Sequence, residues 1–211
     1  MRDLSDQRKN YDWGQLTEAD IKSHPMDQFD RWFDEYRPVC LGEANAMMLS
    51  TLGQKGATAR VVLLKMYGPS GFVFFSNYES RKGQDLLHDD RAGLLFFWQE
   101  LQRQVRVQGR VERISEQESA AYFSSRPRAS QLGAWSSHQS EIIKDRVELE
   151  SRLEKLQKEF EGKEVQKPQN WGGYRLQPEQ MEFWQGRPSR LHDRLEYYRV
   201  RDVWKVRRLA P

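Results

Sequence analysis

Residues 45–77 of the chain read NAMMLSTLGQKGATARVVLLKMYGPSGFVFFSN. Three stretches rich in aliphatic and aromatic side chains, 45–52, 57–67 and 71–77, are separated by two short segments that contain glycine. Stretches of this length bounded by turn-forming residues are typical of β-strands. The sequence therefore predicts three consecutive strands that form an antiparallel meander.

Further strands and helices are predicted on both sides of this region. Similar apolar stretches predict strands at 91–99, 102–114, 181–185, 195–200 and 203–209. Apolar residues at helical spacing and capping signals predict helices at 25–38, 80–89, 115–123 and 141–160. We therefore expect a mainly β fold with peripheral helices (α+β), built as an antiparallel barrel of six to eight strands.

The composition favours one folded domain. Of the 211 residues, 12% are aromatic, which argues against a disordered chain. Residues 1–24 are polar and lack sustained periodicity, so we expect a flexible N-terminal arm followed by a single domain over 25–211. No apolar run approaches the roughly 20 residues of a membrane helix, and no apolar signal segment opens the sequence. We therefore expect a cytoplasmic protein.

The charged and metal-binding residue types narrow the chemistry. A single cysteine and four scattered histidines give no spacing typical of a metal site, so no metal centre is expected. The formal net charge is only +3, but arginine outnumbers lysine among the 34 basic residues. Arginine is suited to gripping phosphate or carboxylate groups, although pairing with the acidic residues on a solvated surface is the more common explanation.

One predicted strand has two distinct faces. Within 104–111, one face carries valines and the other carries Gln104, Arg106, Gln108 and Arg110. The valine face is expected to join the core. The polar face could be solvated, or could meet a second subunit or a polar cofactor.

No glycine-rich phosphate-binding loop is present, so any bound phosphate must be held by side chains. Four clusters offer suitable groups: 60–65, 80–82, 125–130 and 190–194. The second begins a predicted helix, where free backbone N–H groups favour anions. Arg60 and Lys65 are five residues apart, so a regular strand would direct them to opposite faces.

Taken in order, these clusters resemble the pyridoxine (pyridoxamine) 5'-phosphate oxidases, the FMN enzymes that make pyridoxal 5'-phosphate. The resemblance covers nearly the whole chain. Its segments are RVVLLK at 60–65, NYESRK at 77–82, RQV at 103–105, YFSSRP at 122–127 with Ser130-Gln131, Gln139-Ser140, FWQG at 183–186, RLHDR at 190–194 and RLAP at 208–211.

The resemblance implies a split β-barrel homodimer with FMN in two clefts at the interface, each built from both chains. The implied FMN phosphate and ribityl contacts are Arg60, Lys65, Ser76, Arg81, Lys82, Gln139 and Ser140, with Val61, Leu63 and Phe75 also among the cofactor-binding residues. Around the isoalloxazine ring it implies Gln104, Trp184 and Arg194. Phe75-Ser76 stands where the family often has Tyr-Thr, and Gln102 stands where an acidic residue is frequent.

The same resemblance implies a substrate site. The substrate phosphate would be bound by Lys65, Tyr122, Arg126 and Ser130. Arg190 and His192 would lie over the pyridine ring as the catalytic residues, and the arm would bring Arg8 and Tyr11 near the substrate. The implied reaction is oxidation at C4' of pyridoxamine or pyridoxine 5'-phosphate, with hydride passing to flavin N5 and O2 reoxidising the flavin to give H2O2.

Three other functions are weighed against this reading. A flavoprotein of the same barrel class could have another substrate or no catalytic activity. A nucleic-acid-binding barrel is disfavoured because the net charge is small and the acidic residues are interspersed. A purely structural dimer module would bind no flavin. We therefore expect small-molecule partners and a second copy of the chain, with no nucleic acid or membrane partner.

Overall fold

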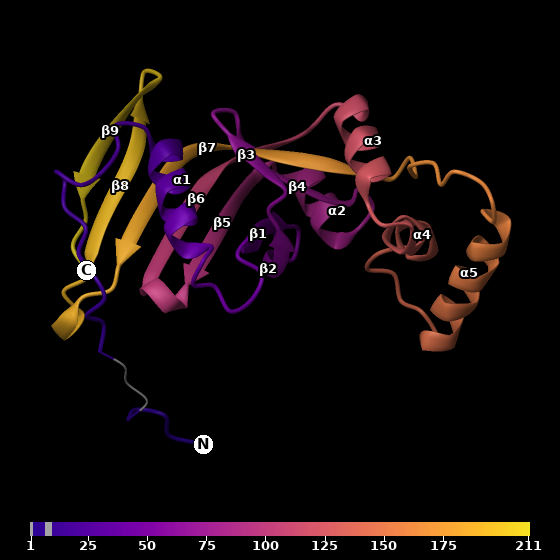
Figure 1. Cartoon of the computed structure of the whole chain (residues 1–211), viewed down its shortest axis with the longest axis horizontal. Coiled ribbons are helices and arrows are strands. Elements are labelled where there is room, and N and C mark those ends of the chain that lie inside the picture. Colours follow the sequence, from indigo (N-terminus) through magenta and orange to yellow (C-terminus); the bar gives the residue numbers. More distant parts are fainter. Residues whose placement is uncertain (1, 7–9) are drawn as a thin grey trace.

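The computed structural model describes residues 2–6 and 10–211, which form one sheet with helices on its outside (Figure 1). The strands are β1 (Ala46–Gly53), β2 (Gly56–Leu63), β3 (Met66–Gly68), β4 (Gly71–Asn77), β5 (Arg91–Trp98), β6 (Arg103–Arg113), β7 (Trp171–Gln185), β8 (Asp193–Val200) and β9 (Val203–Arg208). The α-helices are α1 (Pro25–Tyr36), α2 (Arg81–His88), α3 (Glu116–Ser125), α4 (Arg128–Ser136) and α5 (Arg146–Glu159). The expectation of a mainly antiparallel β fold with peripheral helices is confirmed.

The sheet runs in the order β2-β1-β5-β6-β7-β4-β3, and the β8–β9 hairpin extends from β7. Its two end strands, β2 and β3, are consecutive in the chain. Leu64 and Lys65 connect them: the Leu64 N–H donates to Asn45 O at 2.8 Å, and the Lys65 N–H donates to Val73 O at 2.8 Å. The chain therefore links one edge of the sheet to the other, so the sheet coils around its core.

The strand β7 organises this sheet. Along one edge it pairs with β6, and along the other it pairs first with β4 and then with β8. A bulge between Gln108 and Gly109 shifts the β6–β7 register. A Cβ at Gly109 would lie 1.9 Å from the carbonyl oxygen of Gln177, so only glycine allows this close approach.

Aromatic residues of α1 fill the core. Pro25 opens the helix, and His24 Nδ1 accepts a hydrogen bond from the Met26 N–H at 3.2 Å. The Phe29 ring centre lies 4.9 Å from that of Phe96, and the Trp32 ring centre lies 5.2 Å from that of Phe183. Each buried side chain of this size contributes about 1.5–3 kcal/mol of hydrophobic stabilisation.

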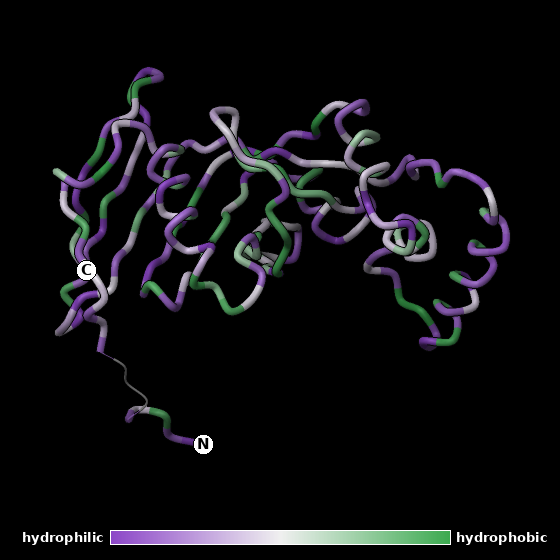
Figure 2. The backbone as a smooth tube through the Cα atoms, viewed as in Figure 1, coloured by the Kyte–Doolittle hydropathy of each residue, from purple (hydrophilic) through white to green (hydrophobic). Residues whose placement is uncertain are grey.

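A second, smaller core lies at the helical end of the molecule. It is formed by buried residues from α3, α4, the segment between α5 and β7, and the start of β7, namely Phe123, Leu132, Val165 and Trp171. Leu153, Leu156 and Phe160, from α5 and the residue that follows it, pack on this cluster. The rest of α5 is largely hydrophilic (Figure 2), and none of its residues is fully buried.

The structure differs from the predicted elements in four places. The stretch 57–67 is two strands, because the connection at 64–65 crosses between sheet edges. The meander is therefore two hairpins: β4 pairs with β3 and β7 and forms no ladder with β2. The helix predicted from 141 begins at Arg146, because the Asp145 side chain caps it by accepting the Glu148 N–H at 3.0 Å. Both α4 and the first half of β7 were absent from the prediction.

In the part of the chain that is described, no helix is both long enough and apolar enough to span a membrane. Part of the segment 10–24, which precedes α1, packs against the rest of the fold. Leu16 is buried, and the N–H groups of Asp12 and Trp13 both donate to Gln102 Oε1, at 2.8 and 3.1 Å. The proposed boundary between an arm and a domain at residue 24 stays a prediction.

Candidate functional site

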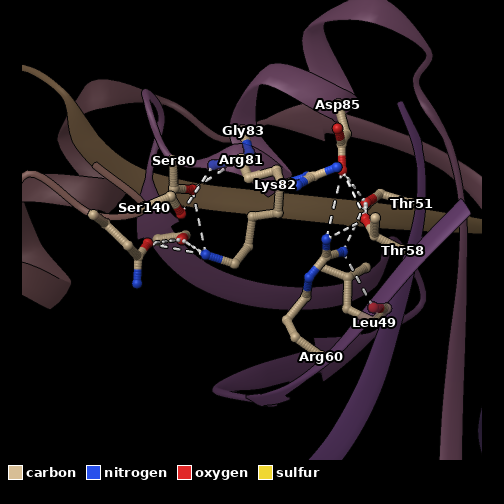
Figure 3. Close-up of polar contacts among 12 residues, drawn as sticks. Leu49, Thr51, Thr58, Arg60, Ser80, Arg81, Lys82, Gly83, Asp85 and Ser140 are labelled. Carbon is tan, nitrogen blue, oxygen red and sulfur yellow. Dashed lines mark hydrogen bonds and ion pairs between the residues drawn. The ribbon is translucent and has the colours of Figure 1, made fainter. Parts of the chain in front are cut away.

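A buried lysine lies where β4, α2 and the loop after α4 meet (Figure 3). Ser80 caps α2, and Lys82 follows in its first turn. The Lys82 ammonium donates to Ser76 Oγ at 2.9 Å, to Gln139 Oε1 at 2.9 Å and to Ser80 Oγ at 3.3 Å. Four residues named from the sequence, Ser76, Lys82, Gln139 and the nearby Ser140, are thus brought together.

This ammonium has only neutral partners. Within residues 2–6 and 10–211, no carboxylate lies within ion-pair distance of Lys82. Burial, and secondarily the charge of Arg60, lowers the pKa of Lys82 to about 8. A buried cation without a carboxylate is costly, and an anionic ligand at this position would offset the cost.

Arg60 belongs to an adjoining network. Its guanidinium donates to Thr51 Oγ1 at 2.7 Å and to Leu49 O at 3.3 Å, and it also bonds Thr58. Asp85 Oδ2 lies 3.5 Å from its Nη2 atom. Arg60 is therefore fixed by residues of its own chain beside the Lys82 cluster.

Other residues expected from the sequence to bind the cofactor lie around these two groups. Arg81 is exposed, and its N–H donates to Ser140 Oγ at 3.2 Å. Val61 is exposed and Leu63 is half-buried on β2. Lys65 is exposed and lies between β2 and β3. Because it is outside both strands, the alternation of side chains along a strand does not determine where it points.

A cavity of about 370 Å³ lies next to the lysine cluster. Among its lining residues are Phe75, Ser76, Arg126, Ser130 and Gln139, all named from the sequence. The structure therefore joins residues expected to bind the cofactor with residues expected to bind the substrate phosphate at one cavity.

Aromatic rings surround the arginine of this cavity. The Arg126 guanidinium carbon lies 4.7 Å from the ring centre of Trp171, and its buried Nη1 atom has no hydrogen-bond partner in the described chain. Burial lowers the pKa of Arg126. The Tyr122 ring stacks on Phe75 with centres 3.9 Å apart. An unpaired, partly desolvated guanidinium at a cavity is suited to bind an anion.

A second group of candidate residues lies on β6, β7 and β8. Gln104 is directly opposite Trp184, and Trp184 is directly opposite Arg194, so the three side chains form one row on one face of the sheet. Arg194 is held by Glu182, whose two carboxylate oxygens each accept a hydrogen bond from it at 3.0 Å. Glu182 is itself almost fully buried.

His192 lies beside this row. Its ring centre is 4.6 Å from that of Trp184, and its Nδ1 accepts the Arg187 N–H at 3.1 Å. Burial, followed by the charge of Arg190, lowers the pKa of His192. Tyr11 packs against both rings, at 5.8 Å from each.

Arg190 is exposed and has a positive φ of 62°. Such a backbone conformation is uncommon for residues other than glycine. Arg8 lies outside the described residues.

The two groups lie at opposite ends of the chain's fold. The cavity with Arg126 and Ser130 is at the end formed by α3 and α4, whereas His192 and Arg194 belong to the end formed by β8 and β9 (Figure 1). One copy of the chain therefore does not bring the candidate catalytic residues next to the candidate substrate-phosphate residues.

Sequence reasoning missed several residues at these sites. Asn77, Ser137 and Trp171 also line the cavity. Asp85 and Glu182 hold Arg60 and Arg194. Trp171 precedes two glycines, which weaken a strand pattern. The two acids carry no local signal because their partners are distant in sequence.

Comparison with known proteins identifies the family. The family model described as "Pyridoxamine 5'-phosphate oxidase" matches residues 33–159. The model described as "Pyridoxine 5'-phosphate oxidase C-terminal dimerisation region" matches residues 171–211. Together the two models cover most of the chain.

Individual relatives agree. A protein named pyridoxine/pyridoxamine 5'-phosphate oxidase from Trichormus variabilis is 50% identical to this chain, over 100% of this chain and 99% of its own length. A protein of the same name from Burkholderia mallei is 51% identical, over 100% of both chains. The crystal structure of PhzG from Burkholderia lata 383, in complex with tetrahydrophenazine-1-carboxylic acid, is similar with a TM-score of 0.87 and 30% identity, over 93% of this chain and 98% of that one. This chain belongs to the pyridoxine/pyridoxamine 5'-phosphate oxidase family.

Proposed function

We propose that the protein is an FMN-dependent oxidase that converts pyridoxamine 5'-phosphate and pyridoxine 5'-phosphate to pyridoxal 5'-phosphate. The observation that carries the proposal is one cavity with two cations that have no carboxylate partner among the described residues: Arg126 lines it, and Lys82 binds Ser76 and Gln139 of its wall. Two phosphorylated molecules, one cofactor and one substrate, would use these two cations. The names of relatives that are 50% identical support the same reaction.

The residues present fit the phosphate of FMN. Among the described residues, the buried Lys82 ammonium has only neutral oxygen partners. Ser76 Oγ and Gln139 Oε1 each lie 2.9 Å from it and 3.1 Å from each other. We propose that Lys82, Ser76, Gln139 and Ser140 hold this phosphate, with Arg60 and Arg81 beside them. Gln104, Trp184 and Arg194 would lie around the flavin ring.

We further propose that the active site is shared by two copies of the chain. The segment that matches a dimerisation region, residues 171–211, carries Trp184, Arg190, His192 and Arg194. These residues lie at the end of the fold opposite the α3 and α4 end, where the Arg126 cavity is. A partner copy would place its Trp184, Arg190 and His192 against this cavity. Each homodimer would then contain two equivalent sites.

The side chains have separate tasks in this reaction. FMN held at this site would supply a hydride acceptor for C4' of the substrate, and O2 would be the final electron acceptor, with formation of H2O2. Arg126 and Ser130 bind the substrate phosphate and fix the distance of C4' from the cofactor. The amine substrate also consumes one water and releases ammonia, whereas the alcohol yields the aldehyde directly.

His192 supplies a hydrogen-bond donor to the substrate. Because its Nδ1 accepts the Arg187 N–H, the neutral ring carries its proton on Nε2. The lowered pKa of His192 keeps the ring neutral at pH 7. The adjacent Arg190 cation would disfavour a protonated substrate amine and so ease loss of the amine proton before hydride transfer.

The proposal is tested by incubating the purified protein aerobically with each 5'-phosphate and measuring pyridoxal 5'-phosphate and H2O2. Equal molar yields of both products are expected, and pyridoxamine without the phosphate should react poorly. A yellow protein that forms neither product would instead be a flavoprotein with another substrate or no catalytic role. A colourless protein would contradict the cofactor assignment.

A further inference from the structure

Asp85 is a buried carboxylate on α2 that lies next to the candidate phosphate site. Its side chain is 9% exposed. Its Oδ2 atom accepts hydrogen bonds from the hydroxyls of Thr51 at 2.7 Å and Thr58 at 2.9 Å (Figure 3). Three separate elements, β1, β2 and α2, therefore meet at one oxygen atom.

The same two hydroxyls also contact Arg60. Their oxygens accept hydrogen bonds from its two terminal nitrogens. A hydroxyl has one proton and two lone pairs. Because each proton points to Asp85, the lone pairs are free to face the guanidinium, so Asp85 sets the direction of both hydroxyls.

The position of the carboxylate is itself fixed. A Cβ at Gly53 would lie 2.2 Å from Asp85 Oδ1, so the β1–β2 hairpin closes directly on it. Burial alone would raise the pKa of Asp85, but the two threonine hydroxyls and the Arg60 charge outweigh it and lower the pKa below its ordinary value. The group is therefore an ionised acceptor at neutral pH.

We propose that Asp85 is a positioning residue for the cofactor: by orienting Thr51 and Thr58 it fixes the Arg60 guanidinium beside the Lys82 cluster, where the cofactor phosphate binds. This inference rests on the proposed function, because it takes the phosphate to be that of FMN. Asp85 acts only through Arg60. If the carboxylate instead competed with phosphate for Arg60, its removal would have the opposite effect.

The test compares FMN with riboflavin, which lacks the phosphate. Apoprotein is prepared from the purified flavoprotein, and both dissociation constants are measured by quenching of flavin fluorescence. Asp85→Ala is expected to weaken FMN binding about tenfold and to leave riboflavin binding unchanged, since one charge-assisted contact to phosphate loses its alignment. Asp85→Asn, which keeps a neutral oxygen acceptor, should lose less. The matched control is Asp89→Ala at the end of the same helix, where the carboxylate binds Arg91 instead.

Each outcome is informative. Unchanged or tighter FMN binding by Asp85→Ala, or an equal loss of riboflavin binding, overturns the inference. If Asp85→Ala does not fold, Asp85→Asn is made in the wild-type protein and in Arg60→Ala. The substitution should change the ratio of the FMN and riboflavin dissociation constants in the wild-type protein and should leave it unchanged in Arg60→Ala. Wild-type protein that fails to prefer FMN over riboflavin overturns the proposed function as well, whereas normal preference in every Asp85 variant overturns this inference alone.

Discussion

The Arg126 guanidinium carbon lies 4.7 Å from the centre of the Trp171 ring, at the wall of a cavity that Ser76 and Ser130 also line. This contact holds the guanidinium without using its hydrogen-bond donors, one of which is buried and unpaired. The arginine is therefore oriented but still available to an anion. A cation over an aromatic ring contributes about 0.5–2 kcal/mol, depending on its exposure.

Removing this arginine should weaken substrate binding specifically. For Arg126→Ala we expect the loss of one charge-assisted contact of about 1.5–3 kcal/mol, or roughly ten- to a hundredfold in substrate affinity. Titration of the flavin spectrum with pyridoxal 5'-phosphate measures it. An unchanged affinity would remove Arg126 from the phosphate site.

Trp171→Leu should act in the same direction but more weakly. Loss of the ring contact leaves Arg126 less well oriented, so the KM for the 5'-phosphate should rise about two- to tenfold with a smaller change in kcat. The control is Trp135→Leu, because Trp135 is exposed at the same helical end and its indole N–H donates to Gln166 O. Equal effects of the two variants would show that Trp171 acts on stability alone.

The lowered pKa of Lys82 predicts a pH dependence of cofactor binding. Phosphate binds the protonated ammonium, so the FMN dissociation constant should rise above pH 8, by about tenfold per pH unit. The stability of the unliganded protein should change in the opposite direction. Between about pH 8 and 10.5 the folded chain has lost the Lys82 proton and the unfolded chain still holds it, so the free energy of unfolding rises with pH. Lys82→Arg keeps its charge and should abolish the dependence of FMN binding. A flat profile for the wild type from pH 7 to 9.5 would contradict the assignment.

Arg190→Ala should separate catalysis from cofactor retention. Arg190 is exposed and remote from the Lys82 cluster of its own chain, so FMN should remain bound while kcat/KM falls far more. Flavin content and turnover per bound flavin provide the two readouts. Loss of flavin with normal turnover per flavin would refute the role given to Arg190.

The sequence predicted the parts of this fold that depend on local pattern. Val105 and Val107 are fully buried, as the alternation in β6 requires. The first half of β7 escaped prediction because Gly172, Gly173 and Pro178 break a strand pattern, yet Pro178 lies opposite the Gly109 bulge. The expectation that Arg60 and Lys65 point to opposite faces assumed one continuous strand. The strand ends at Leu63, and this end is visible only in the sheet topology.

In the candidate site too, residues in local motifs could be named from the sequence, whereas residues that act through distant partners could not. Ser76, Lys82 and Gln139 were named from motifs, and their meeting depends on how α2 and the loop after α4 pack on β4. Asp85, Trp171 and Glu182 have no motif, since each acts through a partner more than ten residues away. Contacts of that range follow from tertiary packing and leave no periodic signal.

Each active site is proposed to combine Arg126 from one copy with Arg190 from the other, and subunit complementation distinguishes this arrangement from a site within one chain. Assayed at substrate concentrations below the wild-type KM, where a loss of affinity lowers the rate, Arg126→Ala and Arg190→Ala homodimers should each be at least about tenfold less active than the wild type. Heterodimers purified with two different affinity tags should regain close to half of the wild-type oxidase activity, because one of their two sites is then intact. Heterodimers as inactive as either parent would place both arginines in a site of a single chain and contradict the account.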